Sequence, residues 1–255
     1  MEGLVLTHEH VTGIDYSGLS TDQFSAQGCT FEDCKFDRAK VGSASFGAGT
    51  EQSQYLRCSF DRVSLTFLGG FARFVGCTFR NARFVRPNAD YLEFVDCTFT
   101  GKITGLEMRG APHGGQARYD ASLRSFARRG LPEPPGYREL ALRESNQIRG
   151  NDFTDAVLVK VFFRFGVDLA AQKLPADGDH LYLPDAGAAV RRAVAALAPD
   201  PSEVAGQARF FLEDVLQREI DFGQRQLLVN PKNFERRDGL PPHIRLAIEQ
   251  LRSPA

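Results

Sequence analysis

The sequence predicts a mainly β fold, a solenoid of short extended segments, followed by a mostly α-helical C-terminal region. The first observation is that large apolar residues recur every five positions, as at Phe31, Phe36, Val41 and Phe46, each preceded two places earlier by a small residue. The second is that 12 of the 21 Phe lie between residues 24 and 99. A helix repeats its apolar positions every 3.6 residues and a strand every two, so a period of five requires a chain that bends at regular intervals.

A longer period sets the size of one turn. Cys58, Cys77 and Cys97 occupy the small slot of three units and lie 19 and 20 residues apart, which is the length of four units. One turn therefore has four sides, three of them regular and one looser. Stacking the turns at the spacing of paired strands, about 4.8 Å, would align equivalent residues into internal columns. Two such columns are Phe60–Phe79–Phe99 and Tyr55–Phe74–Phe94.

The predicted core consists of the large residues at the centres of the units. They are Phe31, Phe36, Phe60, Phe74, Phe79, Phe84, Phe94, Phe99, Phe153, Leu158 and Phe163. Upstream, Ile14, Leu19 and Phe24 keep the spacing of five, and we expect them to continue the inward row. The five cysteines occupy the small slot without any Cys-x-x-Cys pair, so we expect buried thiols rather than metal ligands or disulfides.

These units resemble the repeat of the pentapeptide-repeat family, which is a small residue, a polar residue, a Leu or Phe and two variable residues. The segments CKFDR (34–38), CTFRN (77–81) and NDFTD (151–155) match closely, and the resemblance covers roughly residues 12–106 and 146–165. It implies a right-handed quadrilateral β-helix with Leu and Phe stacked inside. The break after every third unit departs from the family pattern.

The sequence divides into four segments. Residues 1–106 carry the repeats, 107–145 form an insertion with short helices expected at 120–129 and 137–145, and 146–165 form a final turn. Residues 166–255 are expected to be a helical cap or dimerisation region. Its helices are predicted over 185–198, with Asp185 as N-cap, over 202–222, with Ser202 as N-cap, and over 242–252. The segments 181–184 and 226–229 are candidates for short strands.

The charge pattern singles out the insertion. The formal net charge of −1 predicts no general attraction to nucleic acid or to an anionic membrane. Residues 109–150, however, carry eight bases and four acids. A long insertion in a solenoid leaves the surface and often has a function, so its arginines are candidate partner-binding residues, with a merely solvated surface as the alternative. The candidates are Arg118, Arg124, Arg128, Arg129 and Arg138.

Catalytic and metal motifs are not found in the sequence. No nucleophile elbow, phosphate loop or H-E-x-x-H pattern occurs, and His8 and His10 alone make a weak metal site. We therefore expect a protein that is not an enzyme and has no cofactor and no metal. We expect no signal peptide, because no basic region followed by an apolar stretch occurs in Met1–Val11, and no membrane span, because no apolar run is long enough. The odd number of cysteines favours a reducing, cytoplasmic setting.

The leading hypothesis is a non-catalytic binding or scaffold protein that displays a rigid surface to a protein partner. The family resemblance suggests an alternative, because some pentapeptide-repeat proteins look like duplex DNA, bind DNA gyrase and protect it from toxins or quinolone antibiotics. Such mimicry requires a strongly anionic surface, and Arg73, Arg80, Arg83 and Arg86 lie along this array. A further alternative is nucleic-acid or anion binding through the basic insertion. A homodimer and an enzyme hidden in the C-terminal region also stay open.

Overall fold

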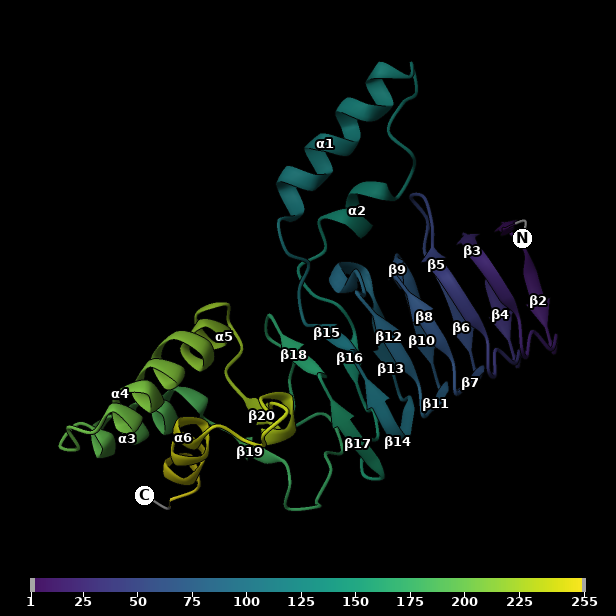
Figure 1. Ribbon diagram of the computed structural model, residues 1–255. Coiled ribbons are helices and arrows are strands. Elements are labelled where there is room, and N and C mark those ends of the chain that lie inside the picture. The colour runs from purple at the N-terminus through teal and green to yellow at the C-terminus, as the bar shows by residue number, and fades with distance from the viewer. Residues whose placement is uncertain (1–2, 254–255) are drawn as a thin grey trace.

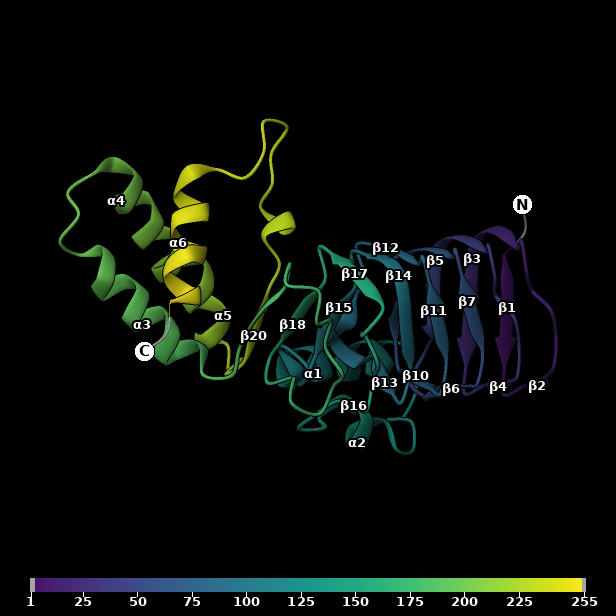
Figure 2. The same cartoon turned by 90° about the horizontal axis from the view of Figure 1, so that it is seen from below.

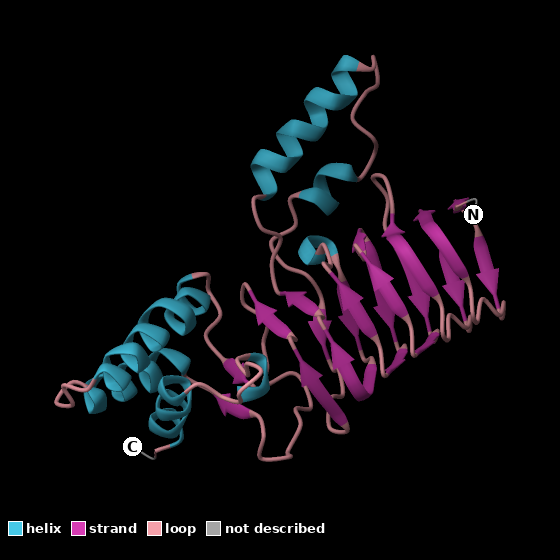
Figure 3. Cartoon of the chain, in the orientation of Figure 1, coloured by secondary structure: helices cyan, strands magenta, loops and turns pink. Residues whose placement is uncertain are grey.

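The computed structural model describes residues 3–253, and its largest part is a parallel β-helix (Figure 1). Strands of successive turns stack on one another, while the described helices longer than one turn lie in an inserted hairpin and in a C-terminal unit (Figure 3). The predicted fold class, a β-helix with a helical C-terminal region, is therefore confirmed.

Each of the four sides is a parallel ladder of short strands from successive turns. The first side contains β2 (His10–Thr12), β4 (Thr30–Glu32), β6 (Ser53–Leu56), β10 (Ala72–Val75), β13 (Glu93–Val95) and β16 (Ile148–Arg149). The second contains β7 (Ser59–Asp61), β11 (Thr78–Arg80) and the start of β14 (Thr98–Thr104). The third contains the starts of β3 (Ser20–Gln27) and β5 (Lys40–Gly47), then β8 (Ser64–Thr66), β12 (Arg83–Val85), the end of β14 and β17 (Ala156–Val159). The fourth contains β1 (Leu4–Thr7), the ends of β3 and β5, β9 (Gly69–Gly70), β15 (Glu107–Arg109) and β18 (Phe162–Arg164).

The corners of the array are formed by residues in the left-handed backbone region. Eleven non-glycine residues in the described range have positive φ, from 50° to 59°, and each stands two places after an inward-pointing position. Asp33 follows Phe31 in this way, and Arg38 follows Phe36. Side chains other than glycine rarely adopt this conformation, so its return every five residues must be imposed by the repeat. This corner conformation accompanies the five-residue period at most corners, whereas β3 and β5 pass from the third side to the fourth without a residue of positive φ.

The interior is filled by stacked rings. Phe60, Phe79 and Phe99 pair in register on adjacent strands, and their ring centroids lie 4.8 and 4.9 Å apart. The other predicted column stacks at 4.9 and 5.1 Å and consists of Tyr55, Phe74 and Phe94. The eleven side chains predicted for the core are at most 6% exposed. Burying one such ring contributes about 1.5–3 kcal/mol, so these columns hold the turns together.

The first turn corrects the expected frame. Ile14 is 46% exposed, and the inward places belong instead to Val11 and Tyr16, which pack against the core. Gly13 and Gly18 have positive φ and stand two places after these residues. The corner residues therefore determine which side chains of this turn point inward. Ile14 keeps the spacing of five but lies on the outside.

Leu19 and Phe24 also stand in the smaller slot, two places before the inward centres. Leu19 is partly buried, whereas Phe24 is fully buried. Phe24 fits because Ala26, the next inward residue, is small, and its ring contacts Phe46 at a centroid distance of 4.6 Å. Large and small residues have exchanged places here, which keeps the volume of the core constant.

The insertion forms a helical hairpin that rises from one side of the array (Figure 1). It contains α1 (Gly115–Arg128), which begins five residues before the predicted start, and the short α2 (Tyr137–Ala141). Tyr119 and Tyr137 pack on Phe71 and on Tyr91, which ends the 3₁₀ segment η1 (Ala89–Tyr91). This small aromatic core fixes the hairpin to the looser fourth side of the array.

The C-terminal unit lies beyond the last turn, at the end opposite the N-terminus (Figure 2). It contains β19 (Leu181–Leu183), α3 (Ala186–Leu197), α4 (Glu203–Phe210), a π-helical segment η2 (Phe211–Leu216), α5 (Gln217–Asp221), β20 (Leu227–Val229), the 3₁₀ segment η3 (Pro231–Asn233) and α6 (Pro242–Arg252). The strands β19 and β20 pair antiparallel. Asp185 and Ser202 cap α3 and α4 through their side chains, as predicted. The π segment was not predicted.

Side-chain amides cover the exposed end of the array. Gln224 is fully buried, and its Oε1 accepts hydrogen bonds from the backbone N–H groups of Gly166 and Val167, while its Nε2 donates to the carbonyl of Val167. Gln226 accepts from the N–H of Leu169. An uncovered strand edge would leave these backbone groups without partners, so the C-terminal unit acts as the cap that a solenoid needs.

Candidate interaction surface

The predicted arginines of the insertion do not form one group. Arg118, Arg124, Arg128, Arg129 and Arg138 are all exposed as residues. Tyr119, Leu123 and Phe126 define the packed side of α1, because they belong to the aromatic cluster beneath the hairpin. Helical spacing therefore places Arg124 and Arg128, four residues apart, together on the outer side.

Two of the five arginines serve the structure. Arg118 forms an ion pair with the buried Asp90, Nη1 to Oδ2 at 2.5 Å, and its guanidinium lies 5.7 Å from the ring centroid of Tyr91. The guanidinium of Arg138 lies 5.7 Å from the ring centroid of Tyr119. Arg118 thus ties the hairpin to the array, while Arg138 joins α2 to α1 within the hairpin, so both are less available to a partner than the others.

The remaining three arginines point to solvent. Within residues 3–253, Arg124, Arg128 and Arg129 form no ion pair, and Leu131 beside them is 52% exposed. We name these three arginines the outer arginines. They combine unneutralised positive charge with a rigid helical support, which is the arrangement that attracts an acidic surface.

A series of ion pairs around the buried Asp90 fixes the base of the hairpin, and no sequence pattern predicted it. Asp90 is 3% exposed and also binds Arg109, whose Nε donates to Glu107 at 2.6 Å. Burial is the largest single effect on the pKa of Arg109 and lowers it, but the hydrogen bonds and charges of Glu107 and Asp90 together outweigh burial and raise the pKa of that guanidinium. Glu107 lies 3.7 Å from Arg164, which pairs at 2.7 Å with Glu219 of α5. These ion pairs link the hairpin, the array and the C-terminal unit.

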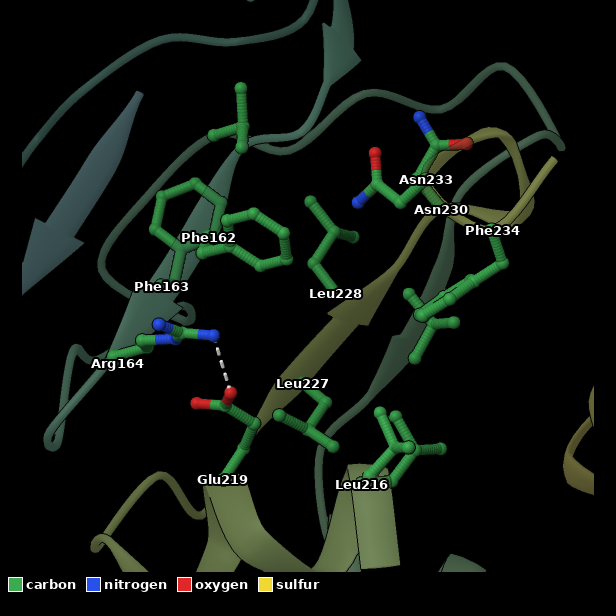
Figure 4. Close-up of a pocket in the computed structure, with 13 residues that line it drawn as sticks. Phe162, Phe163, Arg164, Leu216, Glu219, Leu227, Leu228, Asn230, Asn233 and Phe234 are labelled. Carbon is green, nitrogen blue, oxygen red and sulfur yellow. Dashed lines mark ion pairs between the residues drawn. The ribbon is translucent and has the colours of Figure 1, made fainter. Parts of the chain in front are cut away.

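An apolar pocket lies where the last turn meets the C-terminal unit (Figure 4). Phe162, Phe163, Leu216, Leu227 and Leu228 are among its lining residues, and the Arg164–Glu219 pair lies at its edge. Its volume is about 100 Å³. Ligand pockets generally hold about 300–1,000 Å³, so this pocket is a packing gap between two units rather than a site for a small molecule.

An exposed apolar strip runs along the helices of the C-terminal unit. Phe210 is 65% exposed, Val215 38% and Phe222 49%. Phe210 and Val215 line the same surface hollow, although they are five residues apart, because the π segment between them adds a residue to the turn. Among the described residues, the rings of Phe165 and His113 lie beside Phe222, at centroid distances of 5.6 and 6.2 Å, and leave it half exposed.

The cysteines are free and buried, as expected for thiols of the small inward slot. Burial raises the pKa of Cys34 and of Cys77, and a hydrogen bond with Cys77 raises that of Cys58. Protonated thiols are poor nucleophiles and poor metal ligands. Among the described residues no group of three or more His, Cys, Asp or Glu side chains is arranged to hold a metal ion.

On the array itself, several bases are neutralised by acids of the neighbouring turn. Arg57 pairs with Glu32 and with Asp33, and Arg80 pairs with Asp61 at 2.7 Å. The hydrogen bond from Arg57 holds the pKa of Asp33 below its usual value. Such exposed pairs contribute at most about 1 kcal/mol each, so they shape the surface potential more than the stability.

None of the helices within residues 3–253 combines the length and the apolar character that a membrane crossing requires. No protein-family model matches the chain, and no curated protein is similar to it.

Proposed function

We propose that the chain is a non-catalytic binding protein of the pentapeptide-repeat type, in which the array holds α1 outward and the outer arginines contact an acidic surface of a protein partner. The observation that supports this proposal is the division among the arginines. Arg118 docks the hairpin on Asp90 and Arg138 packs on Tyr119 within the hairpin, while Arg124, Arg128 and Arg129 have no ion-pair partner within residues 3–253. A cytoplasmic setting fits the five free thiols.

The rigidity of the support favours binding over a merely solvated surface. A helix tied to a packed array by a buried ion pair and an aromatic cluster loses little further freedom when a partner binds. The cost of ordering the contact residues is therefore reduced. Charge on such a support affects the association rate first, because complementary potentials steer the encounter.

The test is quantitative capture from native lysate with three forms of the chain. The wild type is compared with a triple R124E/R128E/R129E variant and with the matched control R191E/R192E, which reverses two exposed charges on α3. We expect a protein that the wild type and the control retain and the triple variant loses. Equal recovery with the triple variant, which must keep its circular dichroism spectrum, would contradict the proposal.

The alternative of gyrase protection by DNA mimicry requires a continuous anionic face. Arg38, Lys40, Arg62 and Arg83 are exposed along the second corner and the third side, which weakens that alternative. A supercoiling assay with gyrase and a quinolone, with and without the protein, decides it. Restored supercoiling in the presence of the drug would favour mimicry over the outer arginines.

A further inference from the structure

We propose that the third side of the array carries an anion site, a surface hollow at Lys40, Arg62 and Arg83 that takes the phosphate chain of a small ligand. The hollow is also lined by Ser64, Thr66 and Asn81. It lies on the array, away from α1, so this inference is independent of the proposed protein partner.

The strand register places the cations around the hollow. Lys40, Ser64 and Arg83 are register partners on the adjacent strands β5, β8 and β12. Neighbouring strands are about 4.8 Å apart, so the backbones of Lys40 and Arg83 are separated by about 10 Å, with the short Ser64 between them. Two long cationic side chains therefore flank a floor made by a hydroxyl.

The corner supplies the third cation. Arg62 stands two residues before Ser64 and has φ 53°, and Asn81 holds the same corner position in the next turn, with φ 54°. The Oδ1 of Asn81 accepts a hydrogen bond from the backbone N–H of Lys102. The amide N–H₂ of Asn81 is left as a donor at the hollow. The set of side chains is rich in donors, as an oxyanion requires.

The cations that line the hollow outnumber the carboxylates of the described residues there. Within residues 3–253 none of Lys40, Arg62 and Arg83 forms an ion pair, whereas Arg57, Arg80 and Lys173 on other parts of the array do. Asp61, the residue before Arg62, is itself paired with Arg80. Among the described residues, Asp22 supplies the one carboxylate that lines the hollow, against three cations.

Three cations around one carboxylate favour a ligand with several negative charges. A single phosphate neutralises at most two of them, while a chain of phosphates spans the distance from Lys40 to Arg83. The hollow is open and polar, so it recognises charge rather than an apolar group. The ligand class is therefore a small oligophosphate, either free or as part of a nucleotide.

The test measures binding of inorganic triphosphate, inorganic phosphate and ATP to the full chain by calorimetry at low ionic strength. We expect triphosphate to bind at least about tenfold more tightly than phosphate, since its additional phosphates form further charge-assisted hydrogen bonds. ATP binding as tightly as triphosphate assigns recognition to the phosphates alone, and tighter binding assigns a contribution to the nucleoside. No binding of triphosphate would overturn the proposal.

Arg62→Asn and Arg86→Asn form a matched pair. Both arginines are exposed corner residues with positive φ, 53° and 50°, a conformation that asparagine tolerates, but only Arg62 lines the hollow. We expect R62N to weaken triphosphate binding about tenfold and R86N to leave it unchanged. R83Q, at the wall opposite Lys40, should match R62N. An equal loss in R62N and R86N would show attraction to the overall charge and would overturn the site.

Discussion

Phe60 and Phe79 stack with their ring centroids 4.8 Å apart and their planes 7° from parallel. The distance matches the separation of about 4.8 Å between paired strands, so the backbone ladder sets the spacing of the rings. Aromatic pairs left to themselves favour offset or edge-to-face contacts. Rings from neighbouring sides of the array make edge-to-face contacts. The ring planes of Phe60 and Phe74, for example, meet at 78°. Each ring is thus held along the axis by register and across it by an edge.

Phe79→Ala should destabilise the array more than any surface change. Phe79 is fully buried between Phe60 and Phe99, so the truncation leaves a cavity and should lower the free energy of unfolding by about 3–5 kcal/mol. Urea unfolding followed by circular dichroism measures the effect. The control is Phe67→Asn at an exposed corner with φ 53°, which should be neutral or stabilising. An unchanged midpoint for F79A contradicts the column.

Gln224→Ala should unfasten the cap from the last turn. The fully buried amide of Gln224 serves the N–H of Gly166 and both the N–H and the carbonyl of Val167. Their loss should cost about 2–4 kcal/mol, because a buried backbone group without a partner costs about 1–3 kcal/mol. Hydrogen exchange at Val167 should accelerate. Gln207→Ala, at an exposed residue of α4, is the control and should change stability by less than about 0.5 kcal/mol.

Asp90→Asn should release the hairpin without unfolding the array. The buried carboxylate of Asp90 pairs with Arg109 and with Arg118 of α1, so the variant leaves two guanidinium groups without their charged partner. Hydrogen exchange in α1 should rise at least about tenfold, while β10 and β11 stay protected. Asp33→Asn removes only an exposed pair with Arg57 and should leave both regions unchanged. Protection of α1 in D90N would refute the anchoring role.

Acid should weaken the last turn through Asp152. Hydrogen bonds from Thr154 and from Lys173 lower the pKa of Asp152 to about 2 from its usual 3.8. A depressed folded-state pKa gives stability that is complete above the unfolded value and is lost as the pH falls from about 4 to about 2. The contribution is less than about 1 kcal/mol, because the group is near solvent. Asp152→Asn should flatten the pH dependence of unfolding between these values, and an unaltered profile would contradict this assignment.

The fold could be predicted because its cause recurs in the sequence. Successive turns place Cys58, Cys77 and Cys97 in the same slot, and that period yields the columns directly. The predicted inward positions of the first turn were wrong because the corner residues, rather than the spacing of the apolar residues, determine which side chains point inward. The corner residues are of many types, from a glycine at Gly13 to a phenylalanine at Phe67, so no residue type identifies a corner in the sequence.

The interaction surface could be predicted only in part. The arginines of the insertion are visible in the sequence, but the separation of Arg118 from Arg124 depends on Asp90, an acid in a break of the repeat. The cap by Gln224 gives no sequence signal, because a single glutamine looks the same on a surface as against a strand edge. The hollow at Lys40 and Arg83 depends on strand register, which is set by the length of the loops between turns.

At the corners, surface charge and core packing are independent of each other, although most proteins couple them. Ten of the eleven non-glycine corner residues are exposed, and they include acids, bases, an amide and an aromatic ring on the same backbone geometry. Substitutions at single corners can therefore change the electrostatic potential of the surface while the aromatic columns stay unchanged. The binding preference of such a protein can therefore change while its fold is retained.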